Sequence, residues 1–370
     1  MKKQLLSILT AGCLMAAMVP AAFAADGPMS EEAFRNAVAK GGLVELTGNV
    51  TLSSTLKITD GVTIDGNGYT ITYTPSAQTY AIDIQTNDAV MFQEITIDAT
   101  AGNMTSGISV QNCIPDLTLD NTTLNVKRWG IAFNPTGDGA ELNVVNHSVI
   151  QNKRVSNYET EAAYGDYRGI SLADATQAHI NVSDSTIQGF GYTINLTGTL
   201  VDGIRDFKDT EINVTNSKLM GWTAFNVWAS STEFNITNSY LKGINNSNGH
   251  SDGFSTIVVN DDIYGNGWGS TKENVFNIYG GTITSYRSGT ASEELFRVDD
   301  KGITKVNFYK YNRRTPVAII DGSGDAEAVF NSGYAMLPND WIEYMTKSVT
   351  GDENCTLTGY NGRELLFIPA

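Results

Sequence analysis

The chain has 370 residues and is acidic, with 40 Asp and Glu against 24 Lys and Arg and a formal net charge of −16. Phosphate binding needs clustered Lys and Arg, so this charge argues against nucleic acid as a partner. The Gly-rich and Cys-poor composition fits an exported bacterial repeat protein and argues against a disulfide framework.

Residues 1–24 are predicted to be a secretory signal peptide. The segment opens with two lysines, continues with an apolar run at 5–19 and ends in the small residues of a cleavage site. Cleavage after Ala24 removes the two lysines and takes the formal charge to −18. No later apolar run reaches the roughly 18 residues needed to span a membrane. We therefore expect a secreted or extracellular protein that does not span a membrane, with association at the cell surface left open.

Residues 25–42 are predicted to form an N-terminal cap with a short amphipathic helix. Ser30 can cap the helix, and Phe34 and Val38 lie on one apolar stripe. The chain that follows is predicted to be a stack of β-strands, whose first coil has unpaired edge groups. A helix placed there covers that open end, which otherwise invites aggregation.

Short strands and tight turns follow from residue 43 to about residue 310. The segment 44–72 already contains three or more strands, separated by the turn sequences TGN, TDG and DGNG. Six later stretches repeat one pattern, an alternating strand, a one-turn corner and a second strand. These stretches begin at Asp116, Glu141, His179, Glu211, Glu233 and Val275. One corner copied so often predicts a solenoid.

The spacing of the repeat predicts the size of one coil. One strand position recurs after 22 residues, from Ile97 to Leu119 and again from Val214 to Ile236, which suits three short strands and three turns. The wider gaps are one coil plus an insertion, although the 42 residues between Ile236 and Ile278 also fit two coils. Insertions in a solenoid form rim loops, and such loops often make the binding surface. We expect about ten coils.

The corner residues explain the bend between the two strands. Such a bend needs the left-handed backbone region, which Asn, Asp and Gly tolerate. The corner positions are Asn121, Asn146, Asp184, Asn216, Asn238 and Gly280. Stacked coils place these side chains above one another, where each amide can hydrogen-bond its neighbour. With its five Asn and Asp corners, the chain resembles the right-handed parallel β-helix superfamily, of which pectate lyases are the best-known members, and Gly280 departs from the pattern.

The resemblance implies an all-β fold, a single-stranded right-handed parallel β-helix with a short N-terminal capping helix, of the kind found in secreted bacterial β-helix-repeat proteins. We place the β-helix at residues 43–310 and assign 311–370 to the last coils and a C-terminal cap. The mature chain is interpreted as one domain, because a solenoid has no internal seam where contacts vanish.

In this superfamily the functional groove runs along one sheet, half a coil before each corner. The corresponding strands here begin near Tyr80, Gly107, Trp129, Arg168, Tyr192, Ala224, Ser255 and Leu295. Their outward positions are mostly polar and uncharged. Sugars are bound by aromatic faces together with amide and hydroxyl groups. The candidate binding residues are Asn195, Asn226, Trp228, Asn260, Tyr264, Trp268 and Arg297.

Two insertions are expected to flank this face. The first, at 151–169, carries Tyr158, Tyr164 and Tyr167, and the second is the pair of segments at 245–253 and 261–271. The alternative interpretation is that these are solvated rim loops whose aromatic side chains pin them to the coil.

An enzyme needs separated carboxylates, or carboxylate-bound Ca²⁺ with an Arg or Lys base, as the lyases and hydrolases of the superfamily use. The candidate catalytic residues are Asp202, Arg205, Asp206, Asp252 and Asp261. Only 9 residues separate Asp252 from Asp261, where successive coils demand about 22, and a solvated mixed-charge loop is the alternative. Asp321, Ser323 and Asp325 alternate as in Ca²⁺ loops, but the later bidentate Glu of an EF-hand is missing, which favours a plain turn.

These observations favour a secreted, non-catalytic and monomeric protein that binds carbohydrate or surface glycans, in the manner of β-helix adhesin modules. No cofactor is expected, with Ca²⁺ left open. One alternative is a polysaccharide lyase or glycoside hydrolase acting on an acidic or plant polysaccharide. Another is a structural stalk or spacer.

Overall fold

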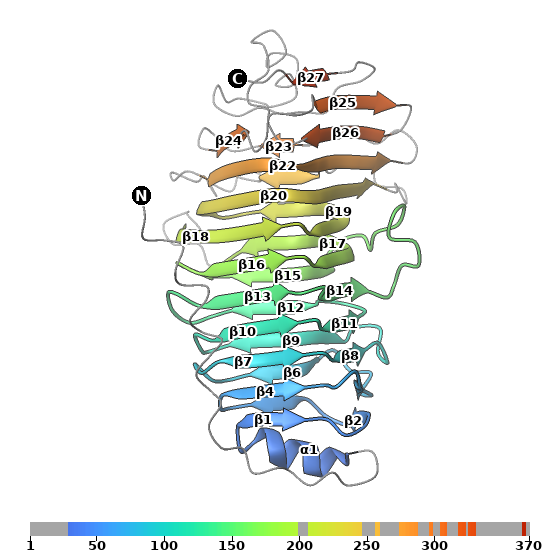
Figure 1. The fold of residues 1–370 in the computed structure, drawn as a ribbon, viewed down its shortest axis with the longest axis vertical. Helices are drawn as coiled ribbons and strands as arrows, with labels where there is room; N and C mark the ends of the chain where they lie inside the picture. The colour runs from blue at the N-terminus through green and yellow to red at the C-terminus, as the bar shows by residue number, and fades with distance from the viewer. Residues whose placement is uncertain are drawn as a thin grey trace.

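The computed structural model describes residues 29–198, 206–245, 256–259 and 274–287, and beyond them the strands at 296–298, 304–308, 317–322, 325–330 and 365–367. In these parts of the chain the fold is all-β, a right-handed parallel β-helix with one short helix at its N-terminal end (Figure 1). The predicted fold class is confirmed. The predicted signal peptide lies outside the described residues, so secretion stays a prediction.

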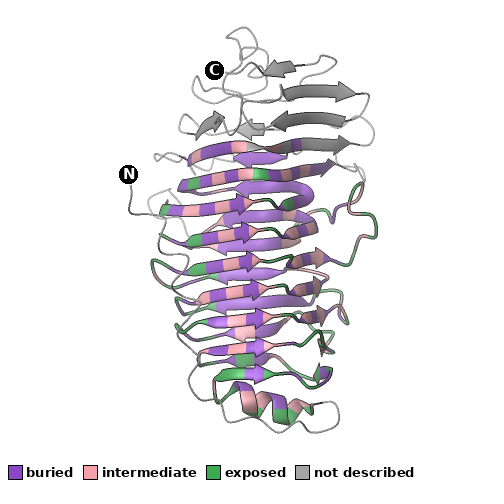
Figure 2. Ribbon diagram, in the orientation of Figure 1, coloured by how far each residue is buried: buried purple, intermediate pink, exposed green. Residues whose placement is uncertain are grey.

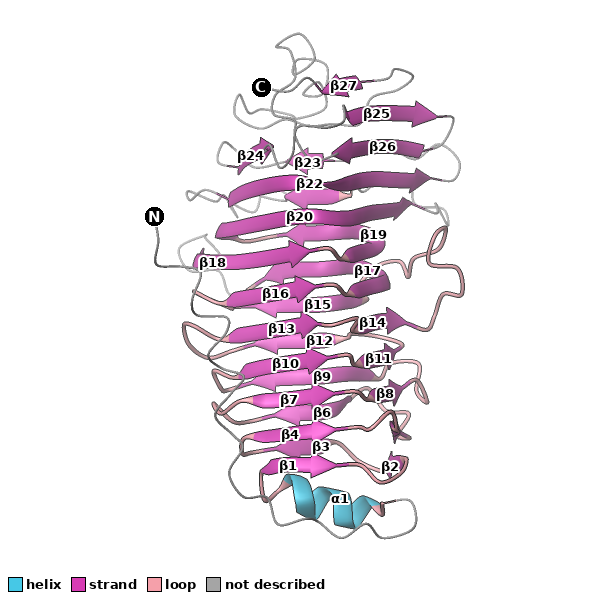
Figure 3. Ribbon diagram, viewed as in Figure 1, coloured by secondary structure: helices cyan, strands magenta, loops and turns pink. Residues whose placement is uncertain are grey.

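Helix α1 (Glu31–Val38) lies beneath the first coil, at the base of the column (Figure 3). The hydroxyl of Ser30 caps it by accepting a hydrogen bond from the backbone N–H of Ala33 at 3.2 Å. Phe34 and Val38 are buried in the same apolar core as the strands of the coil. The predicted capping residue and apolar stripe are therefore confirmed.

Each coil contributes one strand to each of three parallel sheets, which we name A, B and C. Sheet A contains β1 (Gly42–Glu45), β4 (Val62–Asp65), β7 (Val90–Gln93), β10 (Asp116–Asp120), β13 (Glu141–Val145), β16 (His179–Ser183), β18 (Asp206–Thr215), the first parts of β20 (Ser230–Asn245) and β22 (Asn274–Arg287), and β24 (Thr304–Phe308). Sheet B contains β2 (Val50–Leu52), β5 (Thr70–Tyr73), β8 (Thr96–Ala99), β11 (Thr123–Val126), β14 (Val149–Asn152), the first parts of β17 (Thr186–Thr197) and β19 (Lys218–Val227), and the second parts of β20 and β22. Sheet C contains β3 (Leu56–Ile58), β6 (Tyr80–Ile84), β9 (Ser106–Gln111), β12 (Ile131–Asn134), β15 (Arg168–Ala173), the second parts of β17 and β19, β21 (Ile257–Val259) and β23 (Phe296–Val298).

The register of the parallel pairs settles how the wide gaps are used. Ile236 in β20 faces Ile278 in β22 directly, so the 42 residues between them are one coil with an insertion. The two-coil alternative is wrong. Among the described residues sheet A has ten strands, one for each coil, which agrees with the predicted number of about ten.

Alternate residues of the strands point inward and form one continuous core (Figure 2). Leu119, Val144, Val182 and Val214 follow one another in register through sheet A, and all are fully buried. Towards the later coils phenylalanines replace the aliphatic residues. Burial of this regular interior is the main stabilising contribution to the fold, since each fully buried aliphatic or aromatic side chain contributes about 1.5–3 kcal/mol.

The corners between sheets A and B adopt the predicted left-handed conformation. The φ angles of Asn121, Asn146, Asp184, Asn216 and Asn238 are 45°, 53°, 49°, 49° and 46°. Two ladder bonds form here: the amide Nδ2 of Asn216 donates to Asp184 Oδ1 at 3.2 Å, and Nδ2 of Asn238 donates to Asn216 Oδ1 at 2.9 Å. The ladder is exposed to solvent and does not lie at the edge of the core.

Two corners differ from the predicted pattern. Glu94 occupies the left-handed position between β7 and β8, with φ 48°, although glutamate is not a residue that favours this region. In β22 the left-handed glycine is Gly281, with φ 107°, which directly follows the predicted corner residue Gly280. The register partner of Gly281 is Ser239.

A column of buried hydroxyls stands just inside these corners. Its members are Thr122, Ser148, Ser185, Ser217 and Ser239. The hydroxyl of Ser217 accepts the backbone N–H of Ser185 at 3.1 Å and donates to the carbonyl of Thr215 at 2.7 Å. Ser239 does the same for the N–H of Ser217 at 3.1 Å. Ser148 accepts the N–H of Thr122 at 3.0 Å in the same way, so three of these hydroxyls satisfy a backbone donor of the preceding coil.

The parallel pattern ends near residue 310, as expected. Strand β26 (Asp325–Phe330) pairs antiparallel with the second part of β22, and β25 (Val317–Gly322) pairs antiparallel with β26 and with β27 (Leu365–Phe367). Asp321 and Asp325 lie in these two strands, where Asp321 is the register partner of Ala326 and Gly322 that of Asp325. Ser323 lies outside the described residues, and no Ca²⁺ binding is tested there.

Candidate functional site

The strands predicted to form the groove are the strands of sheet C. Their inward residues stack in one register: Ile82, Ile108, Ile131, Ile170, Ile194, Phe225 and Ile257. The predicted inward residues are confirmed, but most of the column on the other side of these strands is buried as well, with Ser109, Ala132, Ser171, Asn195, Asn226 and Val258 at most 6% exposed. The outward column that follows is Asp83, Ser109, Ala132, Ser171, Asn195, Asn226 and Val258.

Glycines at the corner between sheets B and C fix how these strands begin. A Cβ added at Gly130 would lie 2.6 Å from Cγ2 of Ile150 in sheet B and would also collide with the carbonyl oxygen of Gly169. Glycine therefore lets the coil turn closely around the side chains of sheet B. The residue before each glycine is placed at the rim of sheet C, and in two consecutive coils it is Trp129 and Arg168.

Trp129 lies at the centre of a charged group that we call the Trp129 cluster, which also contains Arg128, Asp166 and Arg168. The guanidinium carbons of Arg128 and Arg168 lie 4.5 Å and 4.7 Å from the centroid of the indole ring. Each such contact contributes about 0.5–1 kcal/mol at an exposed site and more when desolvated. The two arginines thus hold the ring in one orientation.

Asp166 joins the members of the Trp129 cluster. Its Oδ1 lies 2.7 Å from Arg168 Nε, and its Oδ2 lies 3.8 Å from Arg128 Nη2. Its backbone carbonyl accepts a hydrogen bond from the indole N–H of Trp129 at 2.9 Å. The side chain of Asp166 is 54% exposed, against 16% for Arg128 and 22% for Arg168. The carboxylate therefore lies at the solvent side of two mostly covered guanidiniums.

The pKa of Tyr80, two coils before Trp129, is shifted by the same charged groups. Burial raises the pKa of its hydroxyl, the positive charges of Arg128 and Arg168 lower it, and the negative charges of Asp166 and Asp83 raise it further. Asp83 is held on the outward column by a hydrogen bond from Gln85 Nε2 to its Oδ2 at 2.6 Å. The face therefore brings two arginines and two carboxylates around one phenol.

The Trp129 cluster was not predicted from the sequence. The predicted binding residues were taken from strand positions beside and after the inward Ile residues, and the residue before each glycine was not among them. The signal was available for Trp129 and Arg168, because the segments WGI and RGI stand in the same register. No periodic signal locates Asp166, because it belongs to the insertion at 151–169.

A second polar group on the outer face of sheet C is a chain of hydrogen bonds that we call the amide chain. The indole N–H of Trp228 donates to Asn226 Oδ1 at 2.9 Å, and Nδ2 of Asn226 donates to Asn195 Oδ1 at 2.7 Å. Trp228 is half-buried, but both amides are only 2–3% exposed. Nδ2 of Asn195 has no hydrogen-bond partner among the described residues. An unpaired buried donor costs about 1–3 kcal/mol.

The structure therefore brings three of the predicted binding residues together. Among the others, Arg297 lies in β23 opposite Val258, and its side chain is outside the described part. Asn260, Tyr264 and Trp268 lie outside the described residues. Their role stays a prediction.

Of the candidate catalytic residues, Asp206 alone is described. It begins β18 on sheet A, where its Oδ1 accepts the backbone N–H of Lys208 at 2.8 Å, and it pairs in register with Ser230. Asp202, Arg205, Asp252 and Asp261 lie outside the described residues. No carboxylate pair can be assigned to these positions from the structure.

The insertion at 151–169 packs onto the outer face of sheet B, as the pinned-loop interpretation expected. Tyr158 packs against a small apolar cluster that contains Trp222, and the rings of Tyr164 and Trp222 meet edge to face at 4.6 Å. Arg154 stacks over Tyr167 at 4.8 Å. Tyr158 and Tyr164 thus anchor the loop to the coil, whereas the contact between Arg154 and Tyr167 lies within the loop.

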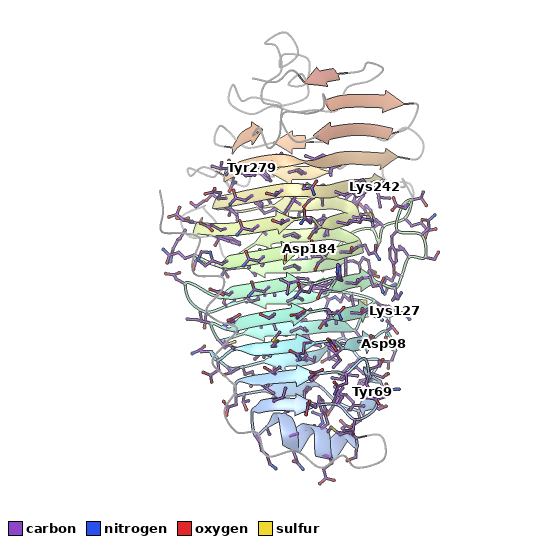
Figure 4. The ribbon with its side chains drawn as sticks, in the orientation of Figure 1. Tyr69, Asp98, Lys127, Asp184, Lys242 and Tyr279 are labelled. Atoms are coloured by element: carbon purple, nitrogen blue, oxygen red, sulfur yellow. The ribbon has the colours of Figure 1, made fainter. Side chains whose placement is uncertain are left out.

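An ion pair between Lys242 Nζ and Glu159 Oε2, at 2.9 Å, adds to this anchor. Burial alone would lower the pKa of Lys242, but the hydrogen bond to Glu159 and the negative charges nearby raise it. Lys242 lies on the sheet B side of the column, well above Asp98 (Figure 4).

Within the described residues, no group of three or more His, Cys, Asp or Glu side chains is placed to hold a metal ion. No helix there has the length and apolar character needed to cross a membrane.

Comparisons with known proteins likewise leave the site to be interpreted from its own geometry. No protein-family model, no curated protein and no solved structure matches the chain. The arrangement itself offers a fixed aromatic ring, guanidinium and amide donors, and carboxylate acceptors along one sheet face.

Proposed function

We propose that this protein is secreted, acts outside the cell or at its surface, and binds carbohydrate without catalysis through the outer face of sheet C. It does so as an adhesin-like member of the right-handed parallel β-helix superfamily. One observation carries the proposal: aromatic, guanidinium and amide side chains from successive coils stand on this one face, in the Trp129 cluster and the amide chain.

Sugar recognition combines stacking on C–H faces with hydrogen bonds to hydroxyl groups. Trp129 is half-buried and already held by two arginines, so a ligand does not have to pay for ordering it. The parallel coils repeat every 4.7–4.9 Å. Side chains on successive coils can therefore contact an extended chain of sugars at several points.

The experiment is a glycan array probed with the mature chain, residues 25–370. Trp129→Ala removes the ring at the centre of the cluster, and we expect binding to weaken by about tenfold or more, because such aromatic anchors carry much of the affinity of an interface. Tyr69→Ala is the matched control. Tyr69 is 39% exposed and lies near the base of the column, away from sheet C (Figure 4).

The array has two results that contradict the proposal. Absence of binding to any glycan favours a stalk or spacer. Equal binding by the two variants shows that the Trp129 cluster is not the binding site.

Cleavage of an acidic or plant polysaccharide is a second candidate function, favoured by the charges around Tyr80. Asp83, Asp166 and two arginines all act on that hydroxyl, and acid–base cleavage needs carboxylates or a base close together on one face. A depolymerisation screen with and without Ca²⁺ tests it. New reducing ends or unsaturated products that disappear in Asp166→Asn would replace the binding proposal with an enzymatic one.

A further inference from the structure

The direction of the amide chain is set by its last member, Trp228. An indole N–H only donates, so it must face the oxygen of the Asn226 amide. The nitrogen of Asn226 then faces Asn195, whose oxygen must point back to accept it. Turning either amide over would place donor against donor or acceptor against acceptor. The Nδ2 of Asn195 is therefore left facing away from Asn226.

The hydroxyl next to Asn195 in the preceding coil belongs to Ser171, and it already accepts a hydrogen bond from another donor. Ser171 is the register partner of Asn195, and its hydroxyl accepts a hydrogen bond from Arg168 Nη1 at 3.0 Å. Neighbouring strands lie 4.7–4.9 Å apart, so the unpaired N–H of Asn195 and the guanidinium of Arg168 flank the same serine. Both are donors.

The other amide ladders show what this position lacks. In every ladder of the described residues the amide nitrogen donates to the preceding coil, so the first member needs an acceptor. The corner ladder ends on the carboxylate of Asp184, which accepts from Asn216. The ladder on sheet A ends where Asn143 Nδ2 donates, at 3.4 Å each, to Asp116 Oδ1 and to the hydroxyl of its register partner Thr118. Both ladders thus have an aspartate among the acceptors of their first amide, and on sheet A a hydroxyl shares that role.

The sheet A ladder continues upward through four more amide bonds of the same direction. They run from Asn181 to Asn143, from Asn213 to Asn181, from Asn235 to Asn213 and from Asn277 to Asn235, at 2.8–3.1 Å. On sheet B, Gln188 donates to Gln151 and Gln151 to Asn125, whose register partner is Asp98. In sheet C the register partner of the first amide, Asn195, is Ser171. The Nδ2 of Asn195 has no acceptor among the described residues.

We infer that Asn195, Ser171 and Arg168 form a subsite for an acceptor oxygen of carbonyl type, the carboxylate or the acetamide of a sugar. The inference rests on the proposed glycan-binding function. The unpaired N–H of Asn195 and the guanidinium of Arg168 both neighbour Ser171, and an oxygen with lone pairs and no hydrogen is the group that accepts from such donors. Asn195 is only 2% exposed, so the subsite takes a substituent and not the sugar ring, and it opens only when the side chains around Asn195 move.

Trp228 then acts as a positioning residue and not as a stacking platform. It sets the direction of the amide chain through its N–H. Trp228→Phe keeps an aromatic ring and removes only that donor, so it separates the two roles. We expect Trp228→Phe to weaken binding of the carbonyl-bearing glycan as much as Trp228→Ala does. Full binding by Trp228→Phe overturns the assignment.

An isosteric pair of variants tests the subsite without any ligand. Asn195→Asp replaces the unpaired N–H with an oxygen that faces the donors, as the aspartates of the other ladders do. Asn226→Asp is the matched control, because it sets a carboxylate oxygen against Asn195 Oδ1. At pH 7 we expect the melting temperature of Asn195→Asp to exceed that of Asn226→Asp by about 3 °C or more. Equal melting temperatures overturn the inference.

Glycan binding by the mature chain and by Asn195→Asp completes the test. The oligosaccharides carry carboxylates, N-acetyl groups or neither. Binding of a carbonyl-bearing glycan should fall by about tenfold or more in Asn195→Asp, whose own carboxylate fills the subsite. Loss of binding with added salt identifies a carboxylate, and salt-independent binding identifies an acetamide.

The remaining outcomes are also decisive. Tight binding only of glycans without carbonyl groups, unchanged in Asn195→Asp, overturns the inference while the proposed function stands. A stabilised Asn195→Asp with no glycan bound refutes the proposed function and supports the unpaired donor. A crystal structure with an ordered water on Asn195 Nδ2, unchanged when glycan binds, overturns the subsite.

Discussion

Gly130→Ala tests the claim that the coil turns too closely around sheet B for any side chain at this corner. The new Cβ would lie 2.6 Å from Cγ2 of Ile150 and would also meet the backbone oxygen of Gly169. Real Cβ atoms keep at least 3.0 Å from such neighbours. Ile150 is fully buried and the oxygen belongs to the next coil, so neither can move without disturbing the core.

Overpacking of this kind costs about 1–3 kcal/mol. For a domain of this size each kcal/mol lowers the melting temperature by about 2–4 °C, so Gly130→Ala should melt about 2–12 °C below the parent. The assay is thermal unfolding of the mature chain followed by circular dichroism. Because Gly130 follows Trp129, the same variant should also weaken glycan binding.

Gly137→Ala is the control, since its added Cβ would come as close, 2.5 Å, to Cδ1 of Ile114. That atom is the end of an exposed, flexible side chain, which can rotate away. We expect a change of less than about 2 °C, as for most surface substitutions. Equal destabilisation by the two variants, or none in Gly130→Ala, would refute the packing argument.

Two further predictions concern the corners and the acidic face of sheet A. Ser217→Ala leaves the buried N–H of Ser185 without its acceptor and should lower the free energy of unfolding by about 1–3 kcal/mol. Ser183→Ala, on the outer face, should leave it unchanged in the same denaturation assay. An unchanged free energy of unfolding in Ser217→Ala would contradict the role of the hydroxyl column. Burial, and then the charge of Glu141, raise the pKa of Asp116, so its ionised form destabilises the fold at neutral pH and this penalty disappears as the pH falls below the ordinary range of a carboxyl. Asp116→Asn should therefore raise the melting temperature at pH 7 and lose that advantage in acid, and a gain that is the same at every pH would disprove the electrostatic cause.

The fold could be predicted because its signals are local. Alternation of apolar and polar residues fixed the inward face of each strand, and Asn or Asp marked five corners correctly. What the sequence left open was long-range: only the pairing of Ile236 with Ile278 showed that the insertion between them belongs to one coil. Glu94 was missed because the stacked coils impose a left-handed corner on a residue that does not favour it.

The site was less accessible from the sequence for a different reason. Alternation correctly placed Asn195, Asn226 and Trp228 outward, and nothing in a pattern of residue types states which amide atom faces which neighbour. That direction comes from side chains of two successive coils acting together. The Trp129 cluster depends in addition on Asp166, whose position follows from how the insertion packs and not from the repeat.

The parallel β-helix itself explains why an unpaired donor arises. Every coil repeats the last in the same orientation, so every amide ladder of the described residues runs in one direction and needs an acceptor at its first coil. Asp184 and Asp116 supply that acceptor on the corner and on sheet A. On sheet C the ladder begins at Asn195, and the residue before it, Ser171, is already engaged by Arg168. The corner and sheet A ladders therefore have an acceptor at their first amide, whereas sheet C leaves a buried, unsatisfied donor next to a serine that a cation already occupies.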